Sequence, residues 1–453
     1  MTIALTVLGR DRFPAWVKRQ PARVRRWLEA AGFVPEPEAG AAILIPEEDG
    51  SIKRAVACLG ENAGPWDWAA IAARLPAGIY HLDGPVAPDS ETAALGWRLA
   101  AYRFGRYKTS AGKPLAELAW PAGCDRDAVL RLEGAIILVR DLINTPAEDM
   151  GPGDLAGAAR NLARRHKARL SVIEGEALLT GNYPAIHAVG RGAVRQPALI
   201  DLRWGPETAP RVTLVGKGVC FDSGGYDLKT AEGMRLMKKD MGGAAHVLGL
   251  ASLVMGAKLK VRLRVLIPAV ENMVSGNALR PGDVVRTRKG PTVEIGNTDA
   301  EGRVILADAL AEAAREQPEL LVDFATLTGA ARIALGTDIP ALFCNDDSLA
   351  GDLLACSAAE GDPLWRLPLW PGYAKQVESK VADLTNNPDG SYGGAITAAL
   401  FLQRFVGPGI PWVHLDLMAW NTSARPGRPE GGEAQALRAL FALLETKFGD
   451  GRN

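Results

Sequence analysis

Five apolar, β-branched runs constrain the fold of this chain more than any other feature of its sequence. They occupy residues 198–202, 212–215, 261–267, 320–324 and 413–417. As a set they lack a strict alternation between apolar and polar residues, and helical patterns such as 241–255 and 304–315 separate them. Strands of this kind are buried on both faces of a sheet. The sequence therefore predicts an α/β domain with a mostly parallel or mixed sheet and helices on both faces.

A second, smaller α/β domain is predicted before residue 124, because short apolar runs alternate there with helical patterns. We expect strands at 42–46, 54–58 and 78–82, and helices at 22–31 and 91–104. Residues 107–123 are rich in glycine, proline and lysine, and a long helical pattern follows until Asn144-Thr145-Pro146 stops it. The predicted organisation is a small domain at 1–123, a linking helix at 124–146 and a large domain at 147–453.

Composition excludes several classes of protein. The 52 basic and 52 acidic residues cancel, so the net charge does not favour nucleic acid or anionic lipid. The basic run from Lys18 to Arg26 has helical spacing and is interpreted as a solvated helix face. The five scattered cysteines lack a Cys-x-x-Cys spacing and indicate reduced thiols in the cytoplasm. The first residues resemble a strand and not a signal peptide, and the longest uncharged run, 241–257, is short for a membrane span.

Charged residues gather in three glycine-rich motifs that stand at the ends of apolar segments. Four carboxylates and three cations lie within 87 residues: Lys217, Asp222, Lys229, Asp240, Asp299, Glu301 and Arg303. Side chains at strand ends are well placed to converge. Four carboxylates within a few ångströms raise one another's pKa, and two divalent cations would cancel their charge. The sequence therefore predicts a metal site.

The ligand types indicate which metals fit. The chain has five histidines and no His-Glu-x-x-His motif, so a one-zinc histidine site is disfavoured. Carboxylate ligation suits a paired site for zinc, manganese, magnesium or cobalt, with a water between the metals as nucleophile. One of Lys217 and Lys229 could become a neutral ligand, while the other lysine and Arg303 would stabilise an anionic intermediate or hold a small anion. This chemistry suits hydrolysis of an amide bond.

Other readings of the same residues are weaker. Residues 216–218 lack the spacing of a phosphate-binding loop, and Phe221 stands where a nucleophile elbow needs glycine. Cys220 could be a nucleophile with His414 or His246, but a lone cysteine in an apolar run is usually packed core. Surface salt bridging is the alternative for the seven charges themselves.

The three motifs, at 215–225, 236–245 and 297–303, resemble the signatures of the leucyl aminopeptidase family, the dinuclear cytosol aminopeptidases, in order and spacing. Segments 141–146, 325–330 and 394–399 support the resemblance. It covers residues 139–450, and the first domain resembles the family only weakly. A metal-dependent aminopeptidase is implied, which makes 147–453 its catalytic domain.

The resemblance also implies a role for each charged residue. Asp222 and Glu301 would bridge both metals, Lys217 and Asp240 would complete the tighter site, and Asp299 the more exchangeable one. Lys229 would polarise the scissile carbonyl and stabilise the gem-diolate. Arg303 would hold a bicarbonate ion that acts as general base. The pocket for the substrate would be lined by Met237, Asn297, Ala300, Thr326 and Gly329.

Substrate and assembly follow from the same resemblance. Met237 is apolar and flexible, so an apolar N-terminal residue is expected, although Met237 could equally be core. Family members form hexamers, and some also bind DNA, so a DNA-binding role, additional or sole, is the alternative function. Two departures, at 226–230 and 427–435, affect substrate preference and touch no proposed ligand.

Overall fold

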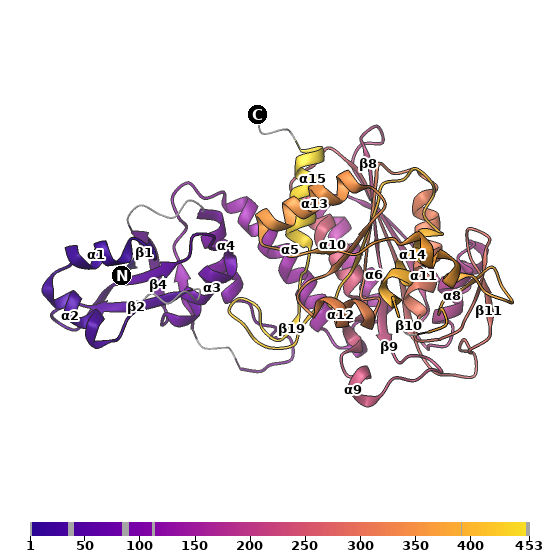
Figure 1. The fold of residues 1–453 in the computed structure, drawn as a ribbon, viewed down its shortest axis with the longest axis horizontal. Coiled ribbons are helices and arrows are strands. Elements are labelled where there is room, and N and C mark those ends of the chain that lie inside the picture. Colours follow the sequence, from indigo (N-terminus) through magenta and orange to yellow (C-terminus); the bar gives the residue numbers. More distant parts are fainter. Residues whose placement is uncertain (1, 35–39, 84–89, 111–113, 391, 450–453) are drawn as a thin grey trace. The chain divides into compact units, whose positions relative to one another are not determined.

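A computed structural model describes residues 2–34, 40–83, 90–110, 114–390 and 392–449 (Figure 1). The chain forms two compact units: a smaller unit of residues 1–137 with 423–430, and a larger unit of residues 138–422 with 431–453. Each unit combines a sheet with helices, which confirms the predicted fold class of two α/β domains. The domain boundaries 1–123, 124–146 and 147–453 stay a prediction.

The smaller unit contains a five-stranded sheet in the order β2-β3-β1-β4-β5. Strand β1 pairs parallel with β3 and β4, β5 pairs parallel with β4, and β2 runs antiparallel on the edge. The strands are β1 (Thr2–Gly9), β2 (Ala41–Pro46), β3 (Ile52–Leu59), β4 (Gly78–Asp83) and β5 (Ala116–Leu118). The helices are α1 (Phe13–Arg19), α2 (Ala22–Ala30), α3 (Pro65–Arg74) and α4 (Ser90–Ala100).

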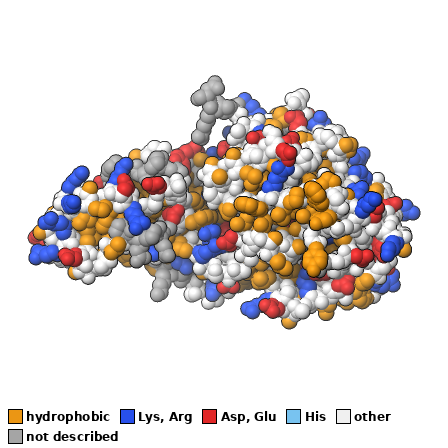
Figure 2. All heavy atoms as spheres, in the orientation of Figure 1, with side chains coloured by type: hydrophobic (Ala, Val, Ile, Leu, Met, Phe, Trp, Pro, Cys, Tyr) orange, Lys and Arg blue, Asp and Glu red, His pale blue; other side chains and the backbone are white. Residues whose placement is uncertain are grey.

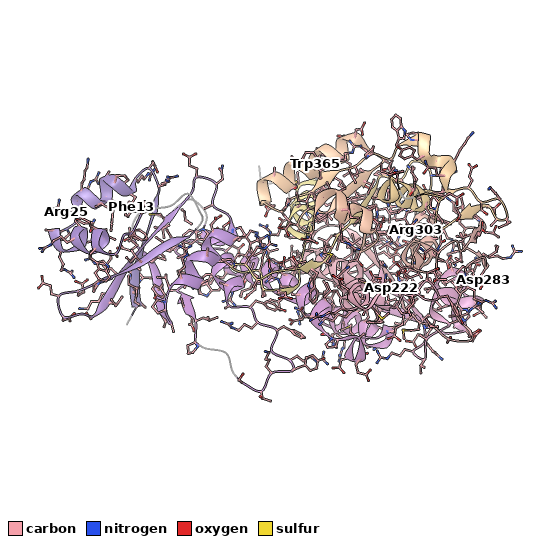
Figure 3. All side chains as sticks on the ribbon, turned by 60° about the horizontal axis from the view of Figure 1, so that its bottom comes forward. Phe13, Arg25, Asp222, Asp283, Arg303 and Trp365 are labelled. Atoms are coloured by element: carbon pink, nitrogen blue, oxygen red, sulfur yellow. The ribbon has the colours of Figure 1, made fainter. Side chains whose placement is uncertain are left out.

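The basic run predicted as a solvated helix face lies on α1 and α2. Phe13, Val24 and Leu28 pack into the core on one side of these helices. Lys18 and Arg25 are exposed on the other side, and Figure 3 shows Arg25 at the outside of this unit. The amphipathic spacing alone therefore accounts for these charges.

The sheet of the larger unit is mixed. Its order is β15-β14-β17-β13-β8-β10-β7-β6, with β9 paired to β10 beyond the end of β8. The central strands β17, β13, β8 and β10 are parallel, whereas β14, β7 and β6 add antiparallel pairs. The strands are β6 (Arg169–Glu174), β7 (Ala198–Trp204), β8 (Arg211–Gly216), β9 (Gly218–Asp222), β10 (Arg262–Asn272), β13 (Leu320–Ala325), β14 (Ala341–Cys344), β15 (Trp365–Arg366) and β17 (Trp412–Asp416).

Helices cover both faces of this sheet (Figure 1). One layer holds α6 (Pro152–His166), α10 (Gly242–Gly256), α13 (Asp347–Glu360) and α15 (Leu437–Phe448). The other holds α8 (Pro184–Gly190), α11 (Glu301–Ala314) and α14 (Gly394–Gln403). Because α10 and α11 are sandwiched between the sheet and outer helices, they are buried almost all round and lack an amphipathic pattern.

The remaining elements connect these layers. The long helix α5 (Arg126–Asn144) leads into the larger unit. The others are α7 (Ala177–Thr180), α9 (Ala231–Met234), α12 (Gly329–Leu335), η1 (Ala147–Asp149), η2 (Met237–Met241), η3 (Pro371–Val377), β11 (Val284–Arg286), β12 (Thr292–Glu294), β16 (Leu384–Thr385), β18 (Trp420–Asn421) and β19 (Gly431–Gly432). No helix among the described residues is both long and apolar enough to cross a membrane.

Two predicted helix boundaries were wrong. The helix expected to start near Val304 begins at Glu301, so Glu301 and Arg303 belong to its first turn and not to the preceding loop. The glycine between them lowers helix propensity, but burial of this turn outweighs that preference. The helix expected to reach Phe104 ends at Ala100.

Both signs of charge are interspersed over the visible face of the larger unit, with hydrophobic side chains between them (Figure 2). This face has no broad region of a single sign, in keeping with the zero net charge of the chain. Most of the charged residues of the three glycine-rich motifs are buried instead.

Candidate metal centre

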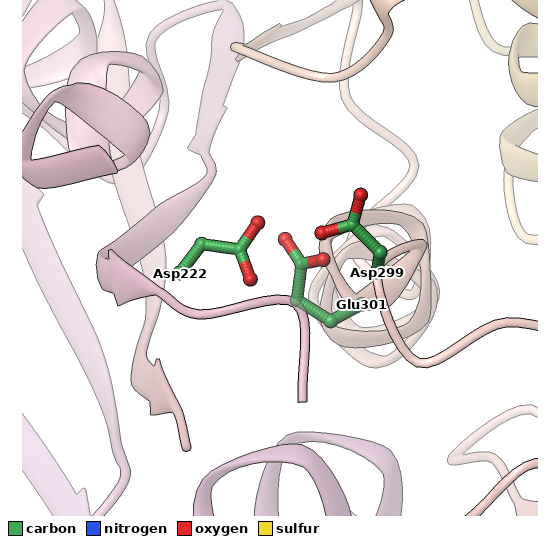
Figure 4. A group of neighbouring side chains, drawn as sticks. All are labelled: Asp222, Asp299 and Glu301. Carbon is green, nitrogen blue, oxygen red and sulfur yellow. The ribbon is translucent and has the colours of Figure 1, made fainter. Parts of the chain in front are cut away.

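The structure brings the predicted charged residues together where parallel strands of the larger unit end. Lys217 directly follows β8, and Asp222 is the last residue of β9. Asp299 and Glu301 stand at the start of α11, and Asp222, Asp299 and Glu301 each offer an oxygen within 4.8 Å of the others. Figure 4 shows these three carboxylates pointing toward one another, Asp222 from the end of β9 and the other two from the start of α11.

Lys217 lies between two of the acidic residues. Its Nζ is 2.7 Å from Asp240 Oδ2 and 2.9 Å from Glu301 Oε1, and its side chain is almost fully buried. It also donates a hydrogen bond to Thr326 O at 3.1 Å. A Cβ on residue 302 would lie 2.4 Å from Lys217 Cε, so only glycine leaves room there for the lysine. The packing therefore fixes Lys217 in the middle of the cluster.

Lys229 occupies the other side of the cluster. Its Nζ lies 2.8 Å from Asp222 Oδ2 and also pairs with Asp299 Oδ1. The side chains of Lys229 and Asp299 are partly exposed, at 16% and 35%, whereas those of Lys217 and Asp240 are not. The lysine on this side is therefore the one that solvent and a substrate can reach.

Asp240 is held by the short helix η2 and by the strand that ends beside it. Thr326, just after β13, donates from Oγ1 to Asp240 Oδ1 at 2.7 Å. The next turn approaches the sheet closely, because a Cβ on Gly243 would lie 2.1 Å from Phe324 O. The glycines after Asp240 therefore let α10 begin directly against the ends of β8 and β13.

Burial and the repulsion between carboxylates shift the pKa values of the acidic groups in the cluster. Burial, then the Asp222 charge, raise the pKa of Glu301 to about 8, although Lys217 opposes the shift. Burial and Asp240 raise the pKa of Asp222 to about 6. Burial would also raise the pKa of Asp240, but Lys217 and Lys239 outweigh it, and that pKa is lowered. Because the pKa values of Glu301 and Asp222 remain raised, Lys217 and Lys229 neutralise the negative charge of the cluster only in part.

The donor set fits divalent cations. The atoms that converge are carboxylate oxygens and an amine, ligands that zinc, manganese and magnesium accept in differing proportions. Glu301 Oε2 is buried and accepts no hydrogen bond from any residue that the structure describes. A buried carboxylate oxygen without a donor is costly, and a bound cation would satisfy it. These residues could therefore hold metal ions.

Arg303 lies in the first turn of α11 and is buried, with Asp222 and Arg303 both inside the larger unit in Figure 3. Burial lowers the pKa of its guanidinium to about 10, still high enough for a full charge at neutral pH. Nη1 donates to Asn386 O at 2.7 Å, while Nε has no hydrogen-bond partner among the described residues. Arg303 therefore has a donor to offer a small anion.

Of the predicted substrate-binding residues, Thr326 and Asn297 contact members of the cluster, and the other three are near such members in the sequence. Thr326 touches Asp240 and Lys217, and Met237 begins the helix η2 that carries Asp240. Asn297 accepts a hydrogen bond at Oδ1 from Asp299 N at 2.7 Å. Ala300 precedes the first turn of α11, and Gly329 begins α12. Their roles stay a prediction.

Sequence reasoning missed two buried asparagines that hold the site. Asn272 ends β10 and donates from Nδ2 to Asp222 Oδ1 at 2.8 Å and to Thr298 O at 3.0 Å. Asn386 follows β16 and contacts the same loop from the other side. The only signal for Asn272 is its place at the end of an apolar run, where a polar residue can reach a site at the strand ends.

The rival nucleophile Cys220 is packed in the core. Burial raises the pKa of its thiol well above the usual value, so little thiolate forms. His246 and His414 are buried and engaged elsewhere: His246 accepts from Gln435 N at 2.9 Å, and His414 pairs with Asp323. The cysteine alternative has no support in this geometry.

Fold and site together define an α/β protein with a carboxylate-rich candidate metal centre. Residues 137–441 match the family model described as "Cytosol aminopeptidase family, catalytic domain", and residues 3–121 match "M17 aminopeptidase, N-terminal domain". The chain belongs to the cytosol aminopeptidase family, as its motifs predicted. It is therefore a hydrolase with an aminopeptidase function that acts on peptides.

Individual relatives agree with this assignment. The chain is 42% identical over 393 residues to a "Probable cytosol aminopeptidase" of Caulobacter vibrioides, covering 82% of this chain and 79% of that protein. It is 41% identical to "Peptidase B" of Serratia proteamaculans, covering 81% and 88%.

Solved structures extend the similarity to the whole chain. The crystal structure of a cytosol aminopeptidase from Coxiella burnetii has a TM-score of 0.95 and 51% identity, covering 99% of this chain and 98% of that one. The "Bottromycin maturation enzyme BotP in complex with Mn" has a TM-score of 0.87 and 36% identity, covering 98% and 99%.

Proposed function

We propose that this chain is a two-metal aminopeptidase of the leucyl type, which releases an apolar N-terminal residue from peptides. The observation that supports the proposal most is the convergence of four carboxylates and two lysines from separate segments in one buried cluster. Such a cluster is costly to bury unless it binds cations. The manganese complex of BotP adds support from a relative of the same fold.

The metal ligands would be divided as the family resemblance implies. Asp222 and Glu301 lie centrally in the cluster and would contact both ions. Lys217 and Asp240, on the more buried side, would complete the tighter site, and the partly exposed Asp299 would complete the exchangeable one. Zinc or manganese suits this mixture of oxygen and nitrogen ligands best, with magnesium or cobalt as further candidates.

Bound divalent ions would supply a water nucleophile at neutral pH and polarise the scissile carbonyl. Lys229 would donate to the carbonyl oxygen as that oxygen gains negative charge. Arg303 would hold a bicarbonate ion through donors such as its unpartnered Nε, so that no protein side chain is needed as general base. Met237, Asn297, Ala300, Thr326 and Gly329 would bind the first residue of the substrate. Assembly as a hexamer and a cytoplasmic location belong to the same proposal.

Hydrolysis of leucine p-nitroanilide by metal-free protein, with manganese, zinc, magnesium or cobalt added in turn, tests this proposal. We expect activity only with metal, and a loss of roughly 100-fold or more in kcat for Glu301→Gln and Asp240→Asn. Glu319→Gln is the matched control, because Glu319 is exposed at the opposite end of β13. Metal-independent hydrolysis, or full activity of Glu301→Gln, would refute the proposal.

The alternative, DNA binding through α1 and α2, stays a prediction. It predicts that the chain binds a DNA duplex at low salt and that its affinity for the duplex falls steeply as salt is added.

A further inference from the structure

Asn386 is fully buried and hydrogen-bonded through every polar atom of its side chain. Oδ1 accepts from Gly296 N at 2.9 Å and from Asn297 N at 3.3 Å. Nδ2 donates to Asn297 O at 2.7 Å and to Ala300 O at 3.2 Å. A primary amide accepts two and donates two hydrogen bonds, so its capacity is filled. If the amide were flipped, its NH2 group would face two backbone N–H groups and its oxygen would face two carbonyl oxygens. The hydrogen-bond partners therefore determine the orientation of the Asn386 amide.

The backbone of Asn386 is tied to the same region. Its N–H donates to Glu294 O at 3.0 Å, continuing the pairing of β16 with β12. Its carbonyl accepts from Arg303 Nη1 at 2.7 Å. Asn386 is the residue whose backbone orients the guanidinium of Arg303.

The loop that Asn386 holds carries the more exposed metal-ligand candidate. Asn297 Oδ1 accepts from Asp299 N, so fixing Asn297 also fixes the backbone of Asp299. From the opposite side, Asn272 joins Thr298 O to Asp222 Oδ1. Residues 296, 297 and 300 are held by one amide and residue 298 by the other, with Asp299 between them.

We infer that Asn386 is a positioning residue for the reaction: it fixes the loop that presents Asp299 and sets the direction of Arg303 from one buried point. The inference rests on the proposed function. It assigns Asn386 an effect on both the exchangeable metal site and the anion held by Arg303, although Asn386 touches neither. A residue that only stabilised the loop would lower thermal stability and leave both binding events unchanged.

The test compares Asn386→Ala and the isosteric Asn386→Asp with Asn345→Ala. Asn345 also joins backbone groups, donating to Ile410 O and accepting from Trp412 N, but at the opposite end of β17 from the cluster. Manganese binding to each metal-free protein is measured by titration calorimetry. We expect both Asn386 variants to bind one of two manganese ions about 10- to 100-fold more weakly. Asn345→Ala is expected to bind as the wild type does.

The second readout is the bicarbonate concentration that gives half-maximal kcat, which we expect to rise in the Asn386 variants and not in Asn345→Ala. Asn386→Asp keeps the side-chain volume, so it tests the inference if the alanine variant does not fold. The inference is overturned if manganese affinity and bicarbonate dependence stay at the wild-type values in a folded Asn386 variant. If the wild type itself lacks metal-dependent hydrolysis, the proposed function fails, while the manganese titrations still decide the role of Asn386.

Discussion

Asp323→Asn gives the sharpest test of the electrostatics inside the larger unit. Asp323 on β13 and His414 on β17 face each other in register, with Asp323 Oδ1 2.6 Å from His414 Nδ1. Trp412 Nε1 donates to the other carboxylate oxygen at 2.7 Å, and all three side chains are completely buried. The substitution keeps the shape of Asp323 and removes its charge.

The pH dependence of this change has a definite sign. Burial alone would lower the pKa of His414, but the charge of Asp323 and its hydrogen bond outweigh burial and raise the pKa above 6.5. The charge of Asp416 raises this pKa further, and the charge of Arg303 lowers it. The pair therefore stabilises the fold fully below pH 6.5, and this contribution is lost as pH rises through the raised pKa. Without the carboxylate, burial favours neutral His414, so the variant should lose stability as pH falls.

The size of the stability loss caused by Asp323→Asn follows from the burial of the pair. Removing one partner of a buried ion pair costs about 3–5 kcal/mol, whereas losing a hydrogen bond to a neutral partner costs about 1–2 kcal/mol. The larger unit has about 300 residues, so its unfolding entropy makes 1 kcal/mol equal to about 1.6 °C in Tm. We expect Tm to fall by about 5–8 °C at about pH 5.5 and about 2–3 °C at about pH 9.

Differential scanning calorimetry of the larger unit's transition in the full chain measures both values. Asp362→Asn is the control, since Asp362 is buried and, among the residues that the structure describes, accepts from backbone N–H groups, those of Ala436, Arg438 and Ala439. Its Tm deficit should be the same at both pH values. An equal deficit at both pH values for Asp323→Asn, or a larger one at high pH, would refute the assignment of a charged pair.

Three further predictions concern the cluster and its surroundings. Gly302→Ala should displace Lys217 and lower manganese affinity at least about tenfold by titration calorimetry, because its Cβ would overlap the lysine side chain. Manganese at about 100 times its Kd should stabilise the chelator-treated protein by about 2.7 kcal/mol per site, seen as a rise in Tm that Glu301→Gln lacks. Cys220 should react with a thiol reagent far more slowly than the partly exposed Cys124, as mass spectrometry of the labelled protein would show.

The sheet of the larger unit could be predicted because each of its main strands is recognisable from its own residues alone. A mostly apolar run such as 212–215 or 320–324 has no face that is polar throughout, so it is expected inside a covered sheet whatever its neighbours are. The charges that follow such runs were predictable for the same reason, since a charge next to a buried strand has few places to lie. The start of α11 was not, because the glycine at position 302 argues locally against a helix and only its packing against Lys217 explains it.

The asparagines that hold the site could not be predicted from the sequence. An amide carries no charge that draws attention in a glycine- and asparagine-rich segment such as 386–390, and Asn386 meets Asn297 across 89 positions of the chain. The importance of Asn386 arises from four hydrogen bonds that exist only once β16 has paired with β12. Motifs therefore indicate the candidate residues for the chemistry, while the residues that orient these candidates are recognised only from the fold.

Charge balance also separates a metal centre from an ordinary network of salt bridges. In a structural network a buried acid is paired with enough positive charge, as Glu312 is: burial raises its pKa, but hydrogen bonds and ion pairs with Arg264 and Arg288 outweigh burial and lower it. In the cluster, Lys217 and Lys229 each pair with two carboxylates, yet the pKa of Glu301 stays raised to about 8. A buried group that remains short of positive charge after both lysines are counted destabilises the fold by itself. Such a cost is characteristic of functional sites, and a ligand of higher charge than lysine is what would remove it.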